Sequence, residues 1–175
     1  MEGRFLNESS VAGLRSAVTS AIDDGISAVF IGDGPLGDAV ALAAAIGTWS
    51  TEILIGVRLG YGAPHRAATL VAREMSTLDQ IAGGRTLVVL AAPFSDDLPD
   101  VVALWRAMWI DGQSDIVNRP LPRRHGGPPI ALDLTNGVTA PPTALAACDL
   151  ILIGPDDAVP GAMPAGTDVC QIQNA

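Results

Sequence analysis

Three side chains that can take part in chemistry adjoin apolar segments of this sequence. Asp33 follows the run ISAVFI, Arg58 lies in the run ILIGVRL, and His65 lies near the start of a long amphipathic segment. Carboxyl and imidazole groups can transfer protons, while a guanidinium can pair with a phosphate or with the carboxylate of Asp33. Each residue also has a structural interpretation: a tight turn at residues 33–35, a charge exposed at a strand end, and a histidine on a helix surface.

The remaining motifs give no second catalytic site. Ser, His and Asp are not grouped as in a nucleophile elbow. Gly32 and Gly34 lack the third glycine of a dinucleotide fingerprint, and the sequence has no Gly-Lys phosphate loop. The two cysteines and two histidines have no metal-ligand spacing, so no metal site is predicted. His125 lies beside Arg123 and Arg124 in a Pro- and Arg-rich connector, where the arginines can hold an anion or keep the loop solvated.

Apolar runs and amphipathic segments alternate along the chain. The clearest unit is a strand at 53–59, a helix at 64–82 with apolar residues every three or four positions, two glycines, and a strand at 86–90. Further strands are expected at 26–31, 129–134 and 149–153, with a possible last strand at 168–172. This alternation predicts a parallel sheet covered by helices, and it fits a doubly wound sheet or a (β/α) barrel.

Composition limits the classes of partner and compartment. The 175 residues suit one domain with a sizeable core. A net charge of -9, with no lysine, argues against nucleic acid and anionic membrane surfaces as partners. No apolar run reaches the roughly 18–20 residues of a membrane span. The start MEGRFLNESS lacks a secretory pattern, and two cysteines suit a reducing compartment, so a cytoplasmic protein is expected.

Five segments together resemble the bacterial luciferase-like flavin monooxygenases and deazaflavin-dependent oxidoreductases. The segment APHRAATLVAREMSTLDQIAGGR is similar to the family's helix that ends in Leu-Asp and then Ser-Gly-Gly-Arg. In the same order as in the family come SAVFIGDGPLGDAVALAAAIGTWSTEILIGV before it, and VVALWRAMWIDG, RPLPRRHGGPPIAL and TALAACDLILIG after it. The resemblance covers roughly residues 10–154.

The resemblance implies an α/β fold of the (β/α) TIM-barrel type, with the active site at the carboxyl ends of the strands. Because family members are commonly about twice as long, we expect one domain over residues 1–175 that forms a reduced or incomplete barrel. An incomplete barrel leaves open strand edges and an apolar lumen. The family is typically dimeric, and a homodimer would cover these surfaces.

The resemblance also implies site residues. Asp33 occupies the position of the family's strand-end acid, and Asp33 and His65 are the candidate catalytic residues. The position after Asp33, a histidine in the deazaflavin branch, is Gly34 here, which removes the proton donor of that branch. The candidate cofactor-binding residues are Asp33, Gly56, Val57, Arg58, Ala91 and Ala92.

Two functions therefore remain open. The first is an oxidoreductase or monooxygenase that uses FMN or a deazaflavin on a small organic substrate. The second is a degenerate, non-redox relative that binds a flavin or an apolar ligand, serves as a partner subunit, or catalyses without a cofactor. Pro93 favours the second, because it removes a backbone donor where the family has a Gly-rich turn, and Phe94 adds bulk there. Cofactor enzymes need the protein chiefly to bind and orient the ring.

Overall fold

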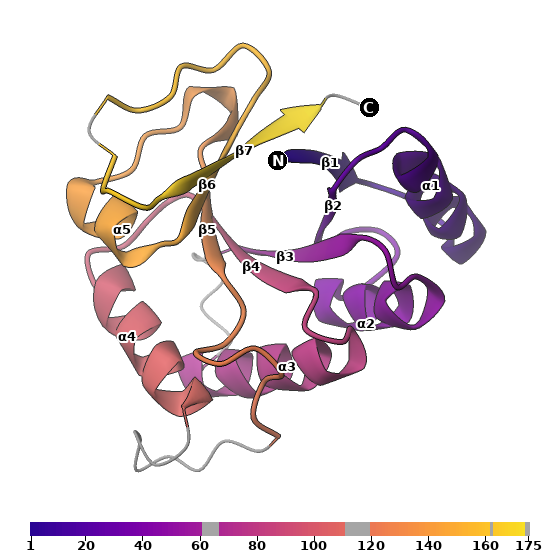
Figure 1. Cartoon of the computed structure of the whole chain (residues 1–175), viewed down its shortest axis with the longest axis horizontal. Coiled ribbons are helices and arrows are strands. Elements are labelled where there is room, and N and C mark those ends of the chain that lie inside the picture. The colour runs from indigo at the N-terminus through magenta and orange to yellow at the C-terminus, as the bar shows by residue number, and fades with distance from the viewer. Residues whose placement is uncertain (61–66, 111–119, 162, 174–175) are drawn as a thin grey trace.

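The computed structural model describes residues 1–60, 67–110, 120–161 and 163–173. In these ranges seven parallel strands form a closed barrel, and helices surround it (Figure 1). The strands are β1 Glu2–Leu6, β2 Ala28–Gly32, β3 Leu54–Gly60, β4 Thr86–Ala91, β5 Ile130–Asp133, β6 Leu150–Ile153 and β7 Asp168–Gln173. The helices are α1 Val11–Asp23, α2 Ala39–Trp49, α3 Ala68–Ile81, α4 Leu98–Trp109 and α5 Pro142–Ala147, with a short 3-10 turn η1 Thr135–Gly137.

The reduced (β/α) barrel is confirmed, and the doubly wound sheet is excluded. The expected open edge is wrong. β7 pairs with β1 in parallel register, with Glu2 opposite Gln171 and Arg4 opposite Gln173, so every strand has two neighbours. A closed sheet leaves no edge for a second subunit to cover. Open strand edges therefore give no reason to expect a homodimer.

One strand was not expected from the sequence, and one helix begins later than expected. The sequence interpretation assigned no strand to residues 2–6, because Gly3 and Arg4 interrupt any apolar run, yet these residues form β1. The long helix was expected to begin near Pro64, but α3 begins at Ala68. The doubtful last strand is present as β7, and it closes the barrel.

The lumen, the space enclosed by the strands, is filled by the barrel's own side chains. The fully buried ring of Phe30 lies between Gly3 and Gly56, where an added Cβ would come within 2.2 Å of a ring atom. Glycine at both positions therefore makes room for the ring, because a closely packed interior leaves no space for an added Cβ there. The ring centroid of Phe30 is 5.4 Å from that of Phe5. The other buried lumen residues are Ala28, Leu87, Val89, Ala131, Leu150, Leu152, Cys170 and Ile172.

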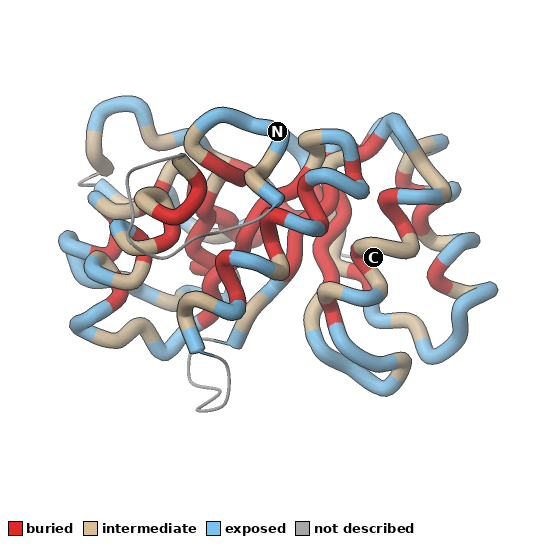
Figure 2. The backbone as a smooth tube through the Cα atoms, turned by 90° about the horizontal axis from the view of Figure 1, so that it is seen from below, coloured by how far each residue is buried: buried red, intermediate tan, exposed pale blue. Residues whose placement is uncertain are grey.

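A second, larger core lies between the barrel and its helices. Buried residues follow the strands and the helix faces turned toward them, whereas exposed residues lie on the outside (Figure 2). α3 buries Val71, Met75 and Leu78 there, as its periodicity predicted. The indole nitrogens of Trp105 and Trp109 donate hydrogen bonds to carbonyls of α3, which ties α4 to α3. Among the described residues, no helix is long and apolar enough to cross a membrane.

Candidate functional site

Strand alternation decides which side chains reach the mouth, by which we mean the carboxyl-terminal end of the lumen. Side chains two residues apart lie on the same face of a strand. Gly56 packs against Phe30 inside the lumen, so Arg58, two residues later on β3, also faces inward at the mouth. Ala131 belongs to the lumen cluster, so Asp133 does the same on β5. The two charged residues thus face each other across β4.

Arg58 and Asp133 form an ion pair at this position. Nε of Arg58 donates to Oδ2 of Asp133 at 2.6 Å. The Asp133 side chain is 3% exposed, whereas that of Arg58 is 43% exposed. The other carboxylate oxygen, Oδ1, accepts hydrogen bonds from the backbone nitrogen and the hydroxyl of Thr135. Asp133 therefore has partners on both oxygens, and its position is fixed from both sides.

The guanidinium of Arg58 also lies over the ring of Phe5, with 5.8 Å between Cζ and the ring centroid. Among the described residues, its hydrogen bond is made through Nε. The buried carboxylate of Asp133 and the aromatic face of Phe5 therefore hold the guanidinium group in place. The exposed part of the side chain faces the mouth. A guanidinium held in this way can bind a carboxylate, a phosphate or a carbonyl oxygen.

A further acidic residue fixes the loops around the mouth. Oδ2 of Asp157 accepts hydrogen bonds from the backbone nitrogens of Gly154 at 2.7 Å and Asn136 at 3.0 Å. These contacts join the loop after β6 to η1, which follows Asp133. The carboxyl-terminal ends of β5, which carries Asp133, and of β6 are thereby connected.

Asp33 is not the partner of Arg58, although the sequence left that pairing open as one of two alternatives. Its carboxylate is exposed and accepts a hydrogen bond from the backbone nitrogen of Ala39 at 2.9 Å, at the start of α2. Gly34 and Gly37 exchange backbone hydrogen bonds in the same loop. The structure thus gives Asp33 the turn-forming role, and the partner of Arg58 is Asp133. Of the two partners considered for Arg58, a phosphate and Asp33, the structure does not show the second.

The other predicted residues divide between the mouth and the barrel wall. Gly56 lies in the lumen against Phe30, and Val57 faces the outer core and is fully buried. Ala91 is buried at the end of β4, opposite Asp133 in register, and Ala92 follows it exposed. His65 lies outside the described residues.

The bulk expected from Phe94 does not enter the lumen. Its half-buried side chain packs against the outer core, while the buried lumen residues belong to a separate cluster. The loss of the Pro93 nitrogen as a donor remains, because proline carries no N–H. Among the described residues, no group of three or more His, Cys, Asp or Glu side chains could hold a metal ion.

The residue that sequence reasoning missed is Asp133. The expected strand at 129–134 already contained it, and an acid at the end of a buried strand was the signal used for Asp33. The register of β5 on β4 turns Asp133 inward, whereas Asp33 lies one residue beyond β2 in a turn. Pairing register, which the sequence alone does not give, separates the two acids.

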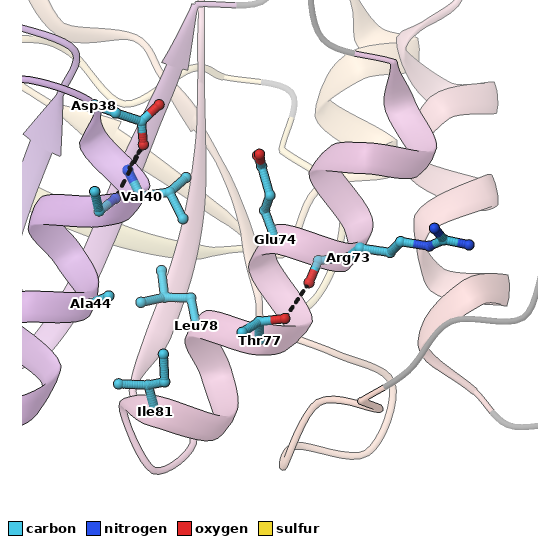
Figure 3. A pocket seen from close by; sticks show the side chains of 9 residues that line it. Asp38, Val40, Ala44, Arg73, Glu74, Thr77, Leu78 and Ile81 are labelled. Carbon is cyan, nitrogen blue, oxygen red and sulfur yellow. Dashed lines mark hydrogen bonds between the residues drawn. The ribbon is translucent and has the colours of Figure 1, made fainter.

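A surface groove lies away from the mouth, on the outer wall between α2 and α3 (Figure 3). It encloses about 390 Å³ and has Val40 and Ala44 on one side and Leu78 and Ile81 on the other. The carboxylate of Asp38 caps α2 at one end through the backbone nitrogens of Val40 and Ala41. The groove carries both charged and apolar side chains.

Comparisons with known proteins support the fold. No family model matches the sequence, and no curated protein matches it at a significant level. A coenzyme F420-dependent tetrahydromethanopterin reductase from Methanopyrus kandleri matches 87% of this chain and 55% of its own, with a TM-score of 0.63 and 14% identity. A monooxygenase from Streptomyces bottropensis matches 89% of this chain and 60% of its own, with a TM-score of 0.65 and 16% identity.

A third match comes from the oxygenating constituent of 3,6-diketocamphane monooxygenase from Pseudomonas putida, a structure in complex with FMN. It matches 87% of this chain and 57% of its own, with a TM-score of 0.62 and 15% identity. In these three comparisons the matched region is about three-fifths of the solved chain or less. Across most of its length, this chain therefore has the fold of the luciferase-like F420- and FMN-dependent oxidoreductases and monooxygenases, as the sequence resemblance predicted.

Proposed function

We propose that the barrel mouth binds a flavin-type cofactor, FMN or a deazaflavin, and that the protein is an oxidoreductase or monooxygenase acting on a small organic substrate. The observation that carries the proposal is the Arg58–Asp133 pair, 2.6 Å apart at the carboxyl-terminal end of the lumen. Active sites of (β/α) barrels lie at this end. One solved protein that shares the fold depends on coenzyme F420, and another was solved in complex with FMN.

The space above the pair suits a flat ring. Small residues end the three neighbouring strands, namely Gly32 on β2, Gly60 on β3 and Ala91 on β4. A Cβ added at Gly60 would meet nothing within 4 Å, and one at Gly32 would meet only ordinary contacts of 3.8 Å or more. A backbone without side chains lets a ring approach closely.

The residues at the mouth have separate tasks in this proposal. A bound flavin-type cofactor would accept or donate the hydride. Arg58 would bind an anionic or carbonyl oxygen of the cofactor, and its charge would favour negative charge on the reduced ring. Asp133 is a positioning residue, because it touches Arg58 and Thr135 and is itself 3% exposed.

A second candidate function is a non-redox relative that binds its ligand without chemistry. The observation in its favour is the position of Asp33, whose carboxylate accepts the Ala39 N–H in a turn. With Gly34 next to it, the described part of this loop offers no histidine as proton donor. A fold can be retained after its chemistry is lost.

The test is equilibrium titration of the purified protein with FMN and with coenzyme F420, followed by absorbance and fluorescence, with riboflavin as the phosphate-free control. The redox proposal expects one of the two phosphate-bearing cofactors to bind, and the bound, reduced cofactor to be reoxidised by oxygen or by a small organic substrate faster than the free reduced cofactor is. Absence of binding for both would refute it. Binding without turnover on any oxidant would favour the non-redox relative.

We further propose a homodimer formed through the α2–α3 groove, with a second copy of this chain as the occupant. Ile81, which lines the groove with acidic and basic side chains, is 44% exposed, and Leu70, elsewhere on α3, is 47% exposed. A two-fold contact would bury both apolar residues and set opposite charges across the axis. Light scattering should give a dimeric mass that Ile81→Glu reduces to a monomer. Val11→Glu, at an exposed position on α1, should leave the dimer intact, and a monomeric wild-type protein would refute the contact.

A further inference from the structure

A cavity of about 400 Å³ lies at the floor of the barrel, by which we mean the amino-terminal end of the lumen, opposite the mouth. Leu54 of β3, Leu87 of β4 and Leu150 of β6 form its apolar base, and all three belong to or pack against the lumen cluster. Cavities that hold small ligands have volumes of about 300–1,000 Å³ and are mostly apolar with a few polar groups. The floor cavity falls within this range, and it does not include any residue of the Arg58–Asp133 site.

The wall of the floor cavity is preformed. Residues 124–127 form one side of it. The backbone nitrogens of Arg123 and Arg124 donate to Oδ2 of Asp79 at 2.7 and 3.1 Å, and Asp79 is fully buried. Gly127 lies so close to the ring of Trp109 that an added Cβ would be 2.0 Å from it. A buried carboxylate at one end and an indole ring at the other therefore hold this segment in place.

The charges that line the floor cavity favour an anion. Arg106 and Asp149 neutralise each other in an ion pair of 2.7 Å. Among the described residues, Arg124 forms no ion pair, and its guanidinium contacts the neutral carbonyl of Gly84 at 3.3 Å. His125 lies beside it. Two carboxylates line the cavity: Asp149, which is paired with Arg106, and Asp168. An arginine without a carboxylate partner is notable in a chain with a net charge of -9.

We infer that the floor cavity is a binding site for a small amphipathic anion. Its apolar part would lie on the leucine base, and its carboxylate or sulfonate would pair with Arg124. This assignment is independent of the cofactor at the mouth, because the two sites share no residue and lie at opposite ends of the lumen. The base supplies affinity through burial of apolar area, and the arginine supplies selectivity for negative charge.

The test uses 8-anilinonaphthalene-1-sulfonate and its neutral analogue N-phenyl-1-naphthylamine, which lacks the sulfonate, as fluorescent probes on the full chain. Arg124→Glu should weaken binding of the sulfonate dye by about tenfold or more, because it replaces an attraction with a repulsion. It should leave binding of the neutral dye within about twofold of the wild type, because the leucine base is unchanged. The matched control is Arg123→Glu, since Arg123 is the adjacent exposed arginine and does not line the cavity.

Two further variants make each result decisive. Arg58→Gln, which places no second carboxylate beside the buried Asp133, should leave binding of the sulfonate dye within about twofold of the wild type, because Arg58 lies at the mouth. Arg124→Gln removes the positive charge without adding a negative one, so it should weaken the dye less than Arg124→Glu and serves if that variant unfolds. Equal effects of the two glutamate variants at 123 and 124, or loss of binding in Arg58→Gln alone, would overturn the floor site.

Discussion

Arg58 Nε and Asp133 Oδ2 lie 2.6 Å apart although 75 residues separate them in the sequence. The two residues come from strands that are not neighbours, and β4 lies between them. The pairing of β3 and β5 with β4 brings them together, because inward-facing side chains of alternate strands share one layer of the lumen. The pair therefore depends on the registers of β3, β4 and β5 and reports on that part of the barrel.

A double-mutant cycle on this pair should show coupling. We expect Arg58→Ala and Asp133→Ala each to lower the free energy of unfolding, and the double variant to cost about 1 kcal/mol less than the sum. The exposure of the Arg58 side chain keeps the value small. Denaturant unfolding measures it. The control cycle is Arg4–Asp24, a pair on the outer side with Asp24 52% exposed, whose coupling should stay below about 0.5 kcal/mol. Additive effects at Arg58 and Asp133 would mean that the pair does not form.

Gly56→Ala should be strongly destabilising, because its new Cβ would lie 2.2 Å from a ring atom of Phe30. We expect a loss of about 1–3 kcal/mol in the free energy of unfolding. Phe30→Leu in the same chain should recover part of this loss by shortening the side chain. Gly60→Ala is the matched control, since a Cβ there meets nothing within 4 Å. Equal melting temperatures for the two alanine variants would contradict the packing of the lumen.

Asp33→Ala separates the two interpretations of Asp33. Its carboxylate accepts the Ala39 N–H at 2.9 Å, so its loss should cost about 1 kcal/mol of stability, as removal of a helix-capping residue does. Asp33→Asn keeps an acceptor oxygen and should retain most of that stability. Cofactor affinity should be unchanged in Asp33→Asn. A large loss of affinity in this variant, with stability retained, would return Asp33 to the binding site.

The two buried thiols should be unreactive and should make stability fall at high pH. Burial raises the pKa of the Cys148 thiol from 9.0 to about 12, and that of Cys170 from 9.0 to about 11. The unfolded chain therefore releases these protons at lower pH than the folded chain does. The stabilisation is fully present below pH 9 and is lost as the pH rises toward 11 for Cys170 and 12 for Cys148.

Two measurements check the thiols. Reaction with Ellman's reagent at pH 8 should require denaturant, because both side chains are buried. The free energy of unfolding of the wild type should decline above pH 9, and Cys148→Ala together with Cys170→Ala should flatten that decline. Rapid labelling of either thiol in the native protein would contradict its burial.

The sequence was sufficient for most strands and insufficient for the site. Strands β2 to β6 are apolar runs between turn residues, and α3 follows a regular apolar period, so local patterns identified them. β1 was missed because its inward position Gly3 is matched to Phe30, a contact between two strands that no local pattern contains. Asp133 was missed for a related reason, since only the pairing register with β4 turns its carboxylate toward Arg58. Barrel closure likewise depends on the pairing of β7 with β1.

The cofactor site at the mouth is tested most directly by comparing the cofactor affinity of Arg58→Ala with that of Arg4→Ala. Arg4 lies on β1, and its partner is Asp24 on the outer side of the barrel. Titration with FMN and coenzyme F420 should show binding to the wild type and to Arg4→Ala. Arg58→Ala should bind about tenfold more weakly, the loss expected for one charge-assisted hydrogen bond. Equal affinity in the two variants, or no binding of either cofactor to the wild type, would contradict a cofactor site at the barrel mouth.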